Sequence, residues 1–409
     1  MQRRKPFSGS YSEKILTLKG LHLTKQLLNR NCKKMVLHGL QLMNGDRRSI
    51  FIHGNKIEQI LAPDDINPVE KNIWFEDCLA FPGLINSHDH LDYNLFPQLG
   101  NRTYKNYLEW GPDIYQQSNE IIQQVLDIPK ELRTKWGVYK NLIAGVTTVI
   151  QHGERLSVPE NLITIFSGCT SLHSVKLEKH WKRRLNRPFA DNPFVIHAGE
   201  GTDLEACNEI DELLRWNIFR RKLIAIHGVA MNEQQAEKFE ALVWCPDSNY
   251  FLLNATAKID QLKSCTKILL GTDATVSANW NIWQHLRLAK AQNMLSDTEL
   301  INAVTQKAAN VWKLDKTGSV KEGYYADLII AKGTGFFSIN PEDIQLMLHK
   351  GKVVLFDASL LIQLHNIPVS DYSVIYVNDV KKYVIGDVPA LIREIRRHMP
   401  AIKFPIDVD

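Results

Sequence analysis

Residues 81–90 read Phe-Pro-Gly-Leu-Ile-Asn-Ser-His-Asp-His. The apolar run opened by Pro82-Gly83 leads into two histidines one residue apart, which predicts a buried strand that ends in a metal site. In an extended chain, residues i and i+2 share a face, so His88 and His90 point to one side and Asp89 to the other. Paired imidazoles suit zinc or iron. A His-x-His pair alone is weak support for a metal, because two histidines are more often structural.

The chain after residue 90 alternates between predicted strands and helices. Apolar, β-branched runs predict strands at residues 146–150, 194–197, 223–227, 241–244 and 267–270. Helical periodicity is found at residues 104–126, 130–144, 204–216, 232–240, 281–293 and 298–312, with a break in the first of these at Gly111-Pro112. This alternation predicts a parallel α/β architecture.

Ligand-type residues lie where several of these strands end. His88 and His90 close the first strand, and His197, His227 and Asp273 close or follow later strands. In a (β/α)₈ barrel the carboxyl ends of the strands share the face on which active sites are built. One histidine at a strand end is usually structural, but this number of ligand-type residues indicates a common site. The sequence therefore predicts an α/β fold with a (β/α)₈ TIM-like barrel.

Short strands precede and follow the predicted barrel. They are expected at residues 35–38, 49–53, 56–60, 323–330 and 351–355, separated by Gly- and Asn-containing turns. We expect them to form one small β-sandwich domain built from N- and C-terminal segments. The predicted division is a 1–33 N-terminal extension without assigned structure, a composite β-sandwich of 34–80 plus 318–365, a barrel of 81–317, and a 366–409 C-terminal extension with a helix near 389–398.

Composition excludes several function classes. The 409 residues are 44% hydrophobic and 23% charged with a net charge of +4, and the basic residues are scattered, so we expect no nucleic-acid partner. The charged N-terminus is not followed by an apolar segment, which argues against a secretory signal. No apolar run is long enough for a membrane span. The six cysteines form no CxxC pair, as expected for reduced thiols in the cytoplasm.

Short motifs occur in the order found in one family. They are PGLINSHDH at 82–90, GVTTV at 145–149, HAGE at 197–200, IHG at 226–228, CPDSN at 245–249 and LGTD at 270–273, followed by GYYADLII at 323–330 and HKGKVV at 349–354. On these residues, which span roughly 34–360, the chain resembles the amidohydrolase superfamily. It is most similar to the mononuclear-metal branch of aminohydrolases and deaminases. That branch includes cytosine, guanine and S-adenosylhomocysteine deaminases with chlorohydrolase-like and imidazolonepropionase-related proteins.

The resemblance implies a role for each matching residue. The ligands of a single divalent metal, Zn²⁺ or else Fe²⁺, would be His88, His90, His197 and Asp273. Glu200 matches the acid that moves protons onto the substrate ring, and His227 matches the histidine that orients the water or polarises the substrate. Asp273 would also accept a proton from that water. Taken alone, Glu200 could be a first-turn helix residue favoured by the macrodipole, and His227 a core histidine bonded to backbone.

One region departs from the family pattern. Between the strands at 146–150 and 194–197 the chain is too short for the two strand–helix units that the family usually has. Residues 170–177 are a candidate strand and 161–166 a candidate helix or strand, so we expect a barrel that is shortened or distorted between its second and fifth strands. Lys176 lies in this region, and binuclear relatives bridge two metals with a carbamylated lysine, but the HAGE acid fits the mononuclear type better.

Five further side chains are candidates for the substrate pocket, namely Tyr93, Trp110, His152, Ser248 and Asn249. The first three fit plain packing equally well, and the two polar residues fit a turn. Cys245 is expected to be a buried small residue, because no partner that would activate its thiol is evident.

This residue set predicts a metal-dependent hydrolase of carbon–nitrogen bonds. A metal held by three nitrogens and one carboxylate lowers the pKa of its water to near 7, and a carboxylic acid can protonate a ring nitrogen and the leaving amine. The leading hypothesis is a deaminase that releases ammonia from a small amino-substituted heterocycle. The alternatives are a hydrolase of the same fold that opens a cyclic amide or imidazolone or cleaves a C–Cl bond, and an inactive scaffold. Homo-oligomers are common in the family.

Overall fold

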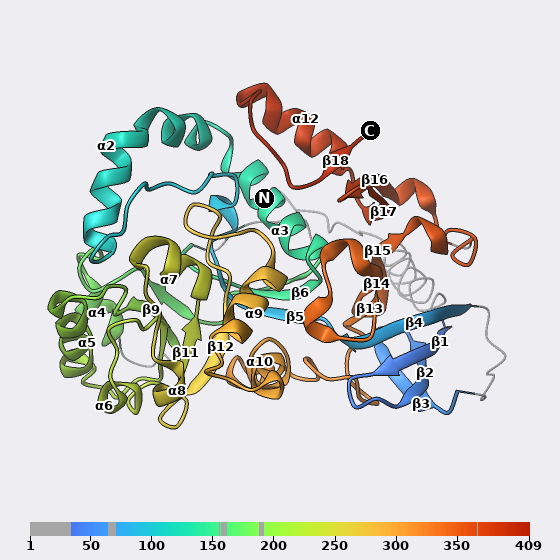
Figure 1. The fold of residues 1–409 in the computed structure, drawn as a ribbon, viewed down its shortest axis with the longest axis horizontal. Helices are drawn as coiled ribbons and strands as arrows, with labels where there is room; N and C mark the ends of the chain where they lie inside the picture. Colours follow the sequence, from blue (N-terminus) through green and yellow to red (C-terminus); the bar gives the residue numbers. More distant parts are fainter. Residues whose placement is uncertain (1–33, 64–70, 155, 157–161, 188–191, 366) are drawn as a thin grey trace, which may run out of the picture.

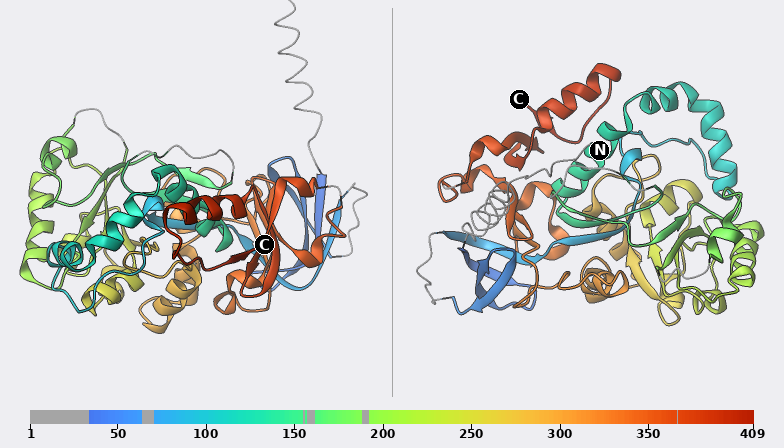
Figure 2. Two further views of the ribbon diagram at one scale, coloured as in Figure 1. Left: turned by 90° about the horizontal axis from the view of Figure 1, so that it is seen from above. Right: turned by 180° about the vertical axis from the view of Figure 1, so that it is seen from behind.

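Parallel and antiparallel strands occupy different parts of the computed structural model, which describes residues 34–63, 71–154, 156, 162–187, 192–365 and 367–409. The predicted extension at residues 1–33 lies outside these ranges. Figure 1 shows a strand–helix part beside a sheet built from the first strands of the chain (blue) and the last strands (orange and red), and the views in Figure 2 agree. The predicted α/β class is confirmed.

A ten-stranded sheet combines strands from both ends of the chain. Its order is β18-β16-β17-β15-β14-β13-β4-β1-β2-β3, and every pair is antiparallel except β1 with β4. Its N-terminal strands are β1 (Lys34–Leu42), β2 (Arg47–His53), β3 (Lys56–Leu61) and β4 (Asn72–Pro82). Its C-terminal strands are β13 (Leu328–Lys332), β14 (Ile344–His349), β15 (Lys352–Asp357), β16 (Tyr372–Val377), β17 (Val380–Ile385) and β18 (Asp407–Val408).

These strands confirm most of the short strands expected from the sequence. The strand predicted at 323–330 is wrong at its start, because β13 begins at Leu328 and Tyr325 forms only an isolated bridge with Lys56. The residues predicted as a C-terminal extension supply β16, β17 and β18 to the same sheet. They also form the helix α12 (Val388–His398), whose buried face includes Leu391 and Ile395.

The stretch at 81–90 passes from this sheet into the parallel strands. Pro82 is the last residue of β4, paired with Leu328, and β5 (Leu84–Asp89) begins two residues later. Gly83 is required between them, since a Cβ there would lie 2.1 Å from a side-chain carbon of Thr147. All six residues of β5 are buried, as is usual for a parallel strand covered on both faces.

In the part of the chain that the structure describes, eight further strands are parallel and form two groups. The first is β5-β6-β7, with β6 (Val146–Gln151) and β7 (Thr164–Phe166). The second has the order β12-β11-β10-β9-β8, with β8 (Thr170–Leu172), β9 (Phe194–Ala198), β10 (Leu223–His227), β11 (Ala241–Trp244) and β12 (Lys267–Leu270). The strands predicted at 146–150, 194–197, 223–227, 241–244 and 267–270 are therefore confirmed.

The short region between β6 and β9 contains two three-residue strands. β7 pairs with β6, and β8, which begins after Ser167-Gly168-Cys169, pairs with β9. Three residues cannot hold a crossover helix, which accounts for the shortness of this region. The strand predicted at 170–177 ends at Leu172. The strand alternative for 161–166 holds at residues 164–166. Asn161 lies outside the described residues.

Helices follow most of the parallel strands. They are α2 (Tyr107–Leu126), α3 (Lys130–Ile143), α4 (Trp181–Leu185), α5 (Leu204–Trp216), α6 (Glu233–Ala236), α7 (Pro246–Leu253), α8 (Ile259–Leu262), α9 (Ile282–Ala291), α10 (Asp297–Ala303) and α11 (Gln306–Val311), with short 3₁₀ turns η2 (Leu91–Tyr93) and η3 (Phe336–Ser338) among the connections. Across the described residues, none of the helices has the length and apolar character needed to cross a membrane.

Three helix predictions need correction. The break expected at Gly111-Pro112 is wrong, because α2 continues through Pro112 and its non-helical residue is Ser118, with φ −127° and ψ 22°. Proline keeps a helical φ, and neither the lost backbone donor nor the crowding of the carbonyl four residues earlier ends this helix. The helix predicted at 232–240 stops at Ala236. The helix predicted at 298–312 is two helices, separated at Thr305, whose φ/ψ values are −136°/−110°.

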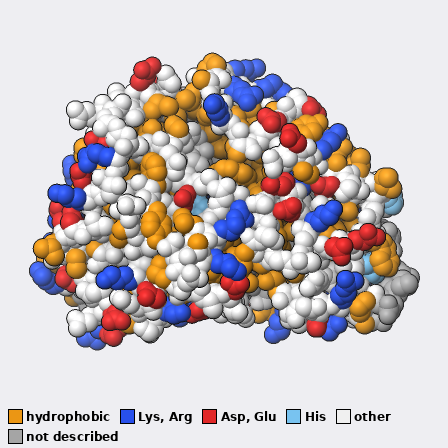
Figure 3. Space-filling view, in the orientation of Figure 1, with side chains coloured by type: hydrophobic (Ala, Val, Ile, Leu, Met, Phe, Trp, Pro, Cys, Tyr) orange, Lys and Arg blue, Asp and Glu red, His pale blue; other side chains and the backbone are white. Residues whose placement is uncertain are grey.

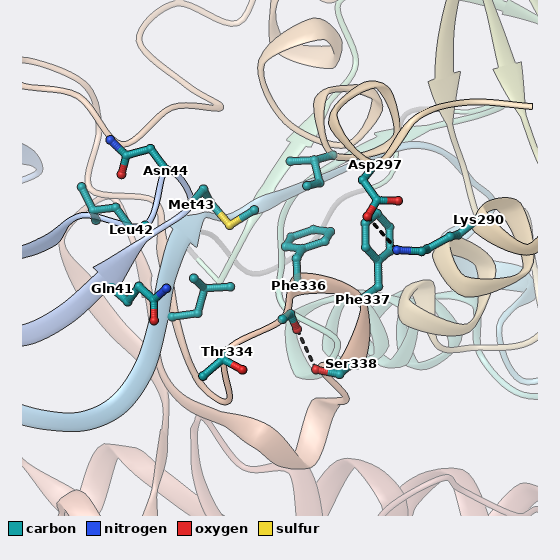
Figure 4. A pocket seen from close by; sticks show the side chains of 14 residues that line it. Gln41, Leu42, Met43, Asn44, Lys290, Asp297, Thr334, Phe336, Phe337 and Ser338 are labelled. Atoms are coloured by element: carbon teal, nitrogen blue, oxygen red, sulfur yellow. Dashed lines mark hydrogen bonds and ion pairs between the residues drawn. The ribbon is translucent and has the colours of Figure 1, made fainter. Parts of the chain in front are cut away.

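A groove of about 620 Å³ lies between the β1–β2 turn, η3 and α9–α10 (Figure 4). Lys290 in its wall pairs with Asp297 at 2.7 Å and lies over the ring of Phe337. None of the fourteen residues that line it is a predicted site residue.

The packing of α3 on η2 can be tested at Gly137. A Cβ at this helix position would lie 2.1 Å from the carbonyl oxygen of Leu91. We expect Gly137→Ala to lower the free energy of unfolding by about 1–3 kcal/mol despite its better helix propensity, because backbone atoms must move. Urea denaturation measures this. Glu131→Ala at an exposed position of the same helix should change it by less than about 0.5 kcal/mol. Equal stability of Gly137→Ala and wild type would contradict the tight contact.

Candidate active site

His88 and His90 point to one side of β5, as the alternation predicted. The rings of His88 and His90 lie 4.9 Å apart, and His88 is almost fully buried. Both approach the same carboxylate oxygen, since Oδ1 of Asp273 lies 3.4 Å from Nε2 of His88 and 3.7 Å from Nε2 of His90. Asp273 follows β12. The edge strand β5 of one parallel group and the edge strand β12 of the other therefore contribute to one cluster.

His197, near the end of β9, completes this group. Its Nδ1 lies 2.8 Å from the carbonyl oxygen of His173, which can only accept a hydrogen bond. The proton of His197 is therefore on Nδ1, and the lone pair of Nε2 faces Nε2 of His90 at 3.4 Å. A backbone acceptor on the far nitrogen is the usual way in which a metal-binding imidazole is oriented.

The spacing of these atoms fits a tetrahedral metal. Two ligands about 2.1 Å from a tetrahedral centre are about 3.4 Å apart, close to the separations of 3.4 and 3.7 Å found here. Nε2 of His88 is buried without a hydrogen-bond partner among the described residues, as expected for an atom reserved for a metal. Two sets of ligand atoms lie within 4.8 Å of one another: His88, His197 and His227, and His88, His90 and Asp273.

Burial keeps His88 and His197 neutral. Desolvation lowers the pKa of His88 to about 4, against the influence of the facing carboxylate of Asp273, and lowers the pKa of His197 well below its usual value. Neutral imidazoles have the free lone pair that a metal requires. Burial would raise the pKa of Asp273, but the facing imidazole of His88 and the other neighbouring histidines hold it well below its usual range.

The two oxygens of Asp273 face different neighbours. Oδ1 faces the histidines, whereas Oδ2 accepts hydrogen bonds from the hydroxyls of Ser248, at 2.8 Å, and Ser277, at 2.9 Å. The carboxylate is therefore fixed in rotation, with one oxygen held by hydroxyl groups and the other left toward the cluster.

Glu200 and His227 form the second half of the site. Nε2 of His227 lies 3.6 Å from Oε1 of Glu200, and both side chains are buried. Nδ1 of His227 lies 2.9 Å from the amide oxygen of Asn249, so it carries a proton and Nε2 is turned toward Glu200. Burial raises the pKa of Glu200 to about 7, which leaves both protonation states accessible near neutrality.

A second buried glutamate supports the loop that carries Glu200. Oε1 of Glu209, on α5, accepts the backbone N–H of Gly199 at 3.0 Å, and Oε2 accepts the hydroxyl of Tyr107 at 2.8 Å. Burial raises the pKa of Glu209 to about 7, against these two hydrogen bonds. Glu209 therefore links α2, α5 and the residue directly before Glu200.

The predicted substrate residues occupy varied positions. His152 is buried against the rings of His88, His90 and His197, and neither of its nitrogens has a partner among the described residues. Tyr93 is half-exposed beside His90. Most of the cluster is covered. In Figure 3 histidine surface is limited to a small area near the middle of the face and to areas at its right edge.

The other three candidates bind protein groups. Ser248 and Asn249 hold Asp273 and His227, respectively. Trp110 donates its indole N–H to the carbonyl of Leu99 at 2.7 Å and packs in a cluster with Tyr104 and Leu252, as its packing alternative predicted. Substrate contact by these residues stays a prediction.

Lys176 is not placed to bridge metals. It lies in a turn after β8, half-exposed, with its ammonium 3.4 Å from Glu205. The question of a carbamylated lysine is thereby answered against Lys176. Cys245 is buried, and burial raises the pKa of its thiol, as expected for a structural cysteine.

Sequence reasoning missed His173, Glu209 and Lys140. His173 directly follows β8, so its position at a strand end is the same signal that identified His197. Glu209 and Lys140 lie on helix faces that look ordinary in the sequence, and only the fold shows that both are buried next to the site.

Comparison with known proteins agrees with this geometry. The amidohydrolase family model matches residues 190–354. The predicted resemblance to amidohydrolases is confirmed. A relative from Caldicellulosiruptor saccharolyticus, a 5-methylthioadenosine/S-adenosylhomocysteine deaminase, is 23% identical over 78% of this chain and 91% of its own. The 5'-deoxyadenosine deaminase of Methanocaldococcus jannaschii is 22% identical over 72% of this chain and 85% of its own.

Solved amidohydrolase structures share the fold. An adenosine deaminase from Xanthomonas campestris with bound zinc superposes with a TM-score of 0.67 at 16% identity, over 90% of this chain and 98% of that one. An atrazine chlorohydrolase from Arthrobacter aurescens in complex with zinc gives a TM-score of 0.60 at 16% identity, over 90% of this chain and 100% of that one.

The raised pKa of Glu209 predicts a pH-dependent stability. Since the pKa of this carboxyl is about 7 in the folded chain against 4.5 ordinarily, the folded state loses stability as the pH rises from about 4.5 to about 7. We expect Glu209→Gln to remove about 1–3 kcal/mol of that loss. Urea denaturation of the metal-free protein at pH 4.5 and pH 8 measures it. Parallel pH profiles for wild type and variant would contradict the assignment.

Proposed function

We propose that this chain is a metal-dependent aminohydrolase that deaminates a small amino-substituted heterocycle. The observation that carries the proposal is the convergence of three buried or partly buried imidazoles and one carboxylate, three pairs of which lie 3.4 to 3.7 Å apart, with the carboxyl of Glu200 beside His227. A structural polar cluster would pair its donors with acceptors, whereas here imidazole nitrogens face one another.

The metal would be held by His88, His90, His197 and Asp273, and zinc suits this set of three nitrogens and one oxygen. When bound, it supplies an activated water near neutral pH. Zinc is also the metal named with the two structural neighbours.

Glu200 would carry protons during the reaction. With a pKa of about 7 its carboxyl can donate a proton to a ring nitrogen and, after recharging, to the departing amino group. Asp273, whose carboxylate is held ionised, would accept a proton from the attacking water. His227, fixed through Asn249, would orient the water or the substrate atom under attack.

We infer that adenine nucleosides are the first substrates to test. The relatives named above are deaminases of 5'-modified adenosines, and the exocyclic amine of adenine is the kind of leaving group that this arrangement can protonate. Cyclic-amide or C–Cl hydrolysis is the alternative, since an activated water can also attack those carbons. Release of ammonia distinguishes deamination from both.

We further propose a shortened barrel for β5 to β12. Strands β5 and β12, at the edges of the two parallel groups, approach one another at their carboxyl ends. There the backbone N–H groups of Thr272 and Asp273 both donate to the carbonyl of His88 at 3.1 Å. On the opposite side, residues 164–172 pair first with β6 and then with β9. We propose the ten-stranded sheet, including β16–β18, as the second domain.

Removing one imidazole tests the metal site. We expect wild type to contain about one zinc per chain, and His197→Ala to lose it while the circular dichroism spectrum is kept, because the other ligands cannot close a tetrahedral site. Elemental analysis measures the metal. His38→Ala replaces a buried histidine of the ten-stranded sheet and should keep the metal. Metal retained by His197→Ala would exclude the proposed ligand set.

Glu200→Gln tests the proton carrier. The amide has the shape of the carboxyl but cannot deliver a proton, so we expect the metal to be retained and turnover of the best adenosine substrate to fall about 10²–10⁴-fold. Ammonia release measures this. Glu205→Gln, at an exposed position on α5, should leave turnover unchanged. Normal turnover in Glu200→Gln would show that another group moves the protons.

A further inference from the structure

A buried ion pair lies on the far side of β5 from the histidines. The ammonium of Lys140, on α3, is 2.9 Å from Oδ2 of Asp89, and both side chains are almost completely buried, at 1% and 0% exposure. Lys140 also donates to Oδ1 of Asn94 at 3.1 Å and to Oγ1 of Thr272 at 3.3 Å. A buried ammonium is stable only when its donors are met in this way.

Asp89 is the residue between the two histidines. Because side chains alternate along a strand, the direction of Asp89 and the directions of His88 and His90 are set together. Its carboxylate is bound from several sides: Oδ2 accepts from Asn141 at 2.7 Å and Oδ1 accepts from Asn94 at 2.8 Å. A rotation of β5 that moved the histidines would break these bonds.

Thr272 connects the same network to the other ligand strand. It directly precedes Asp273, its hydroxyl accepts from Lys140 and from Nδ2 of Asn86, and its backbone N–H donates to Oδ1 of Asn86 at 3.0 Å. Asn86 also donates to Asp89. Each of the residues Asp89 and Thr272 is therefore adjacent in sequence to a predicted metal ligand.

The network lies at one of the two places where, among the described residues, no ladder joins the two groups of parallel strands. Among the ladders of the described residues none joins β5 to β12, and the backbone contact consists of the bonds from Thr272 and Asp273 to His88. Side-chain bonds through Lys140, Asn86 and Asp89 add links across this junction that a ladder supplies between other strands.

We propose that Lys140 is a positioning residue for the metal site. Through Asp89 and Thr272 it holds the ends of β5 and β12 at the separation at which His88, His90 and Asp273 converge. This inference rests on the proposed function, because it assumes that these residues bind a metal.

A second buried ion pair offers a matched control. Lys382, fully buried in the ten-stranded sheet, lies 3.2 Å from Asp357 and donates to the carbonyl of Ile344 at 2.8 Å. Its burial and its bonds resemble those of Lys140, but Lys382 belongs to strand β17 of the ten-stranded sheet, whereas Lys140 belongs to helix α3. Loss of either lysine leaves a buried carboxylate without its counter-charge, so both losses should lower stability.

The experiment compares wild type with Lys140→Met, Lys382→Met and the double variant Lys140→Met/Asp89→Asn. Each full-length protein is stripped of metal and titrated with Co²⁺, whose visible absorption depends on coordination geometry. The dissociation constant for Zn²⁺ is then measured by competition with a chelator. The double variant has no unpaired buried charge, so it separates loss of stability from loss of position.

We expect Lys140→Met and the double variant to bind Zn²⁺ about 10–100-fold more weakly than wild type, the range for residues that orient ligands. Their Co²⁺ spectra should change, whereas Lys382→Met should keep the wild-type spectrum and affinity. If Lys140→Met does not fold, the double variant carries the comparison.

Two results would overturn the inference in distinguishable ways. Wild-type spectrum and affinity in Lys140→Met or in the double variant would remove Lys140 from the metal site and leave the proposed function intact. A wild-type protein that binds neither Co²⁺ nor Zn²⁺ would remove the proposed function, and the inference with it.

Discussion

The alternation of side chains along β5 is the constraint on which the site depends. The last two residues of β5 and the residue that follows them present an imidazole, a carboxylate and an imidazole to alternating sides. The histidines face the other predicted ligands. The carboxylate of Asp89 is buried against α3, where a charged group requires a partner of opposite charge. Because Asp89 stands between the two histidines, the proposed metal-binding face has a carboxylate on the opposite side of the strand. The ammonium of Lys140 lies 2.9 Å from that carboxylate and neutralises its charge. The two faces are one structural unit.

The carboxyl groups of the site show how position decides charge. Asp273 and Glu200 are both buried, yet the facing imidazole of His88 keeps the pKa of Asp273 low, whereas burial outweighs the influence of His227 on Glu200 and raises its pKa to about 7. One group is held as an anion for a cation, and the other can gain and lose a proton. Environments that push two carboxyls apart in this way are typical of acid–base chemistry.

Much of the site could be predicted because the signals are local. A histidine after an apolar run is visible in the sequence, and the fold brings such strand ends together, as it does for His88, His197 and His227. The strands themselves were predicted from β-branched runs, since burial on both faces leaves little other choice of residue. The absence of a crossover helix between β7 and β8 could be predicted only in outline, because the sequence shows too few residues between the strands at 146–150 and 194–197 but not which helix is missing. Lys140 and Glu209 could not be predicted, because on a helix the burial of a charged residue depends on what packs against that face.

Two of the predicted site residues have a left-handed backbone, as have several other non-glycine residues of the described ranges. His227 and Asp273 have φ values of 71° and 58°, in the left-handed region where a residue with a Cβ is disfavoured. Such a conformation costs of order 1–3 kcal/mol unless the surroundings enforce it. Asp273 is held by its backbone bond to His88, and His227 is followed by Gly228, whose N–H donates to Ala198. Glycine would be the easier residue at both turns, and the roles proposed for the imidazole and the carboxylate give a reason why glycine does not occupy them.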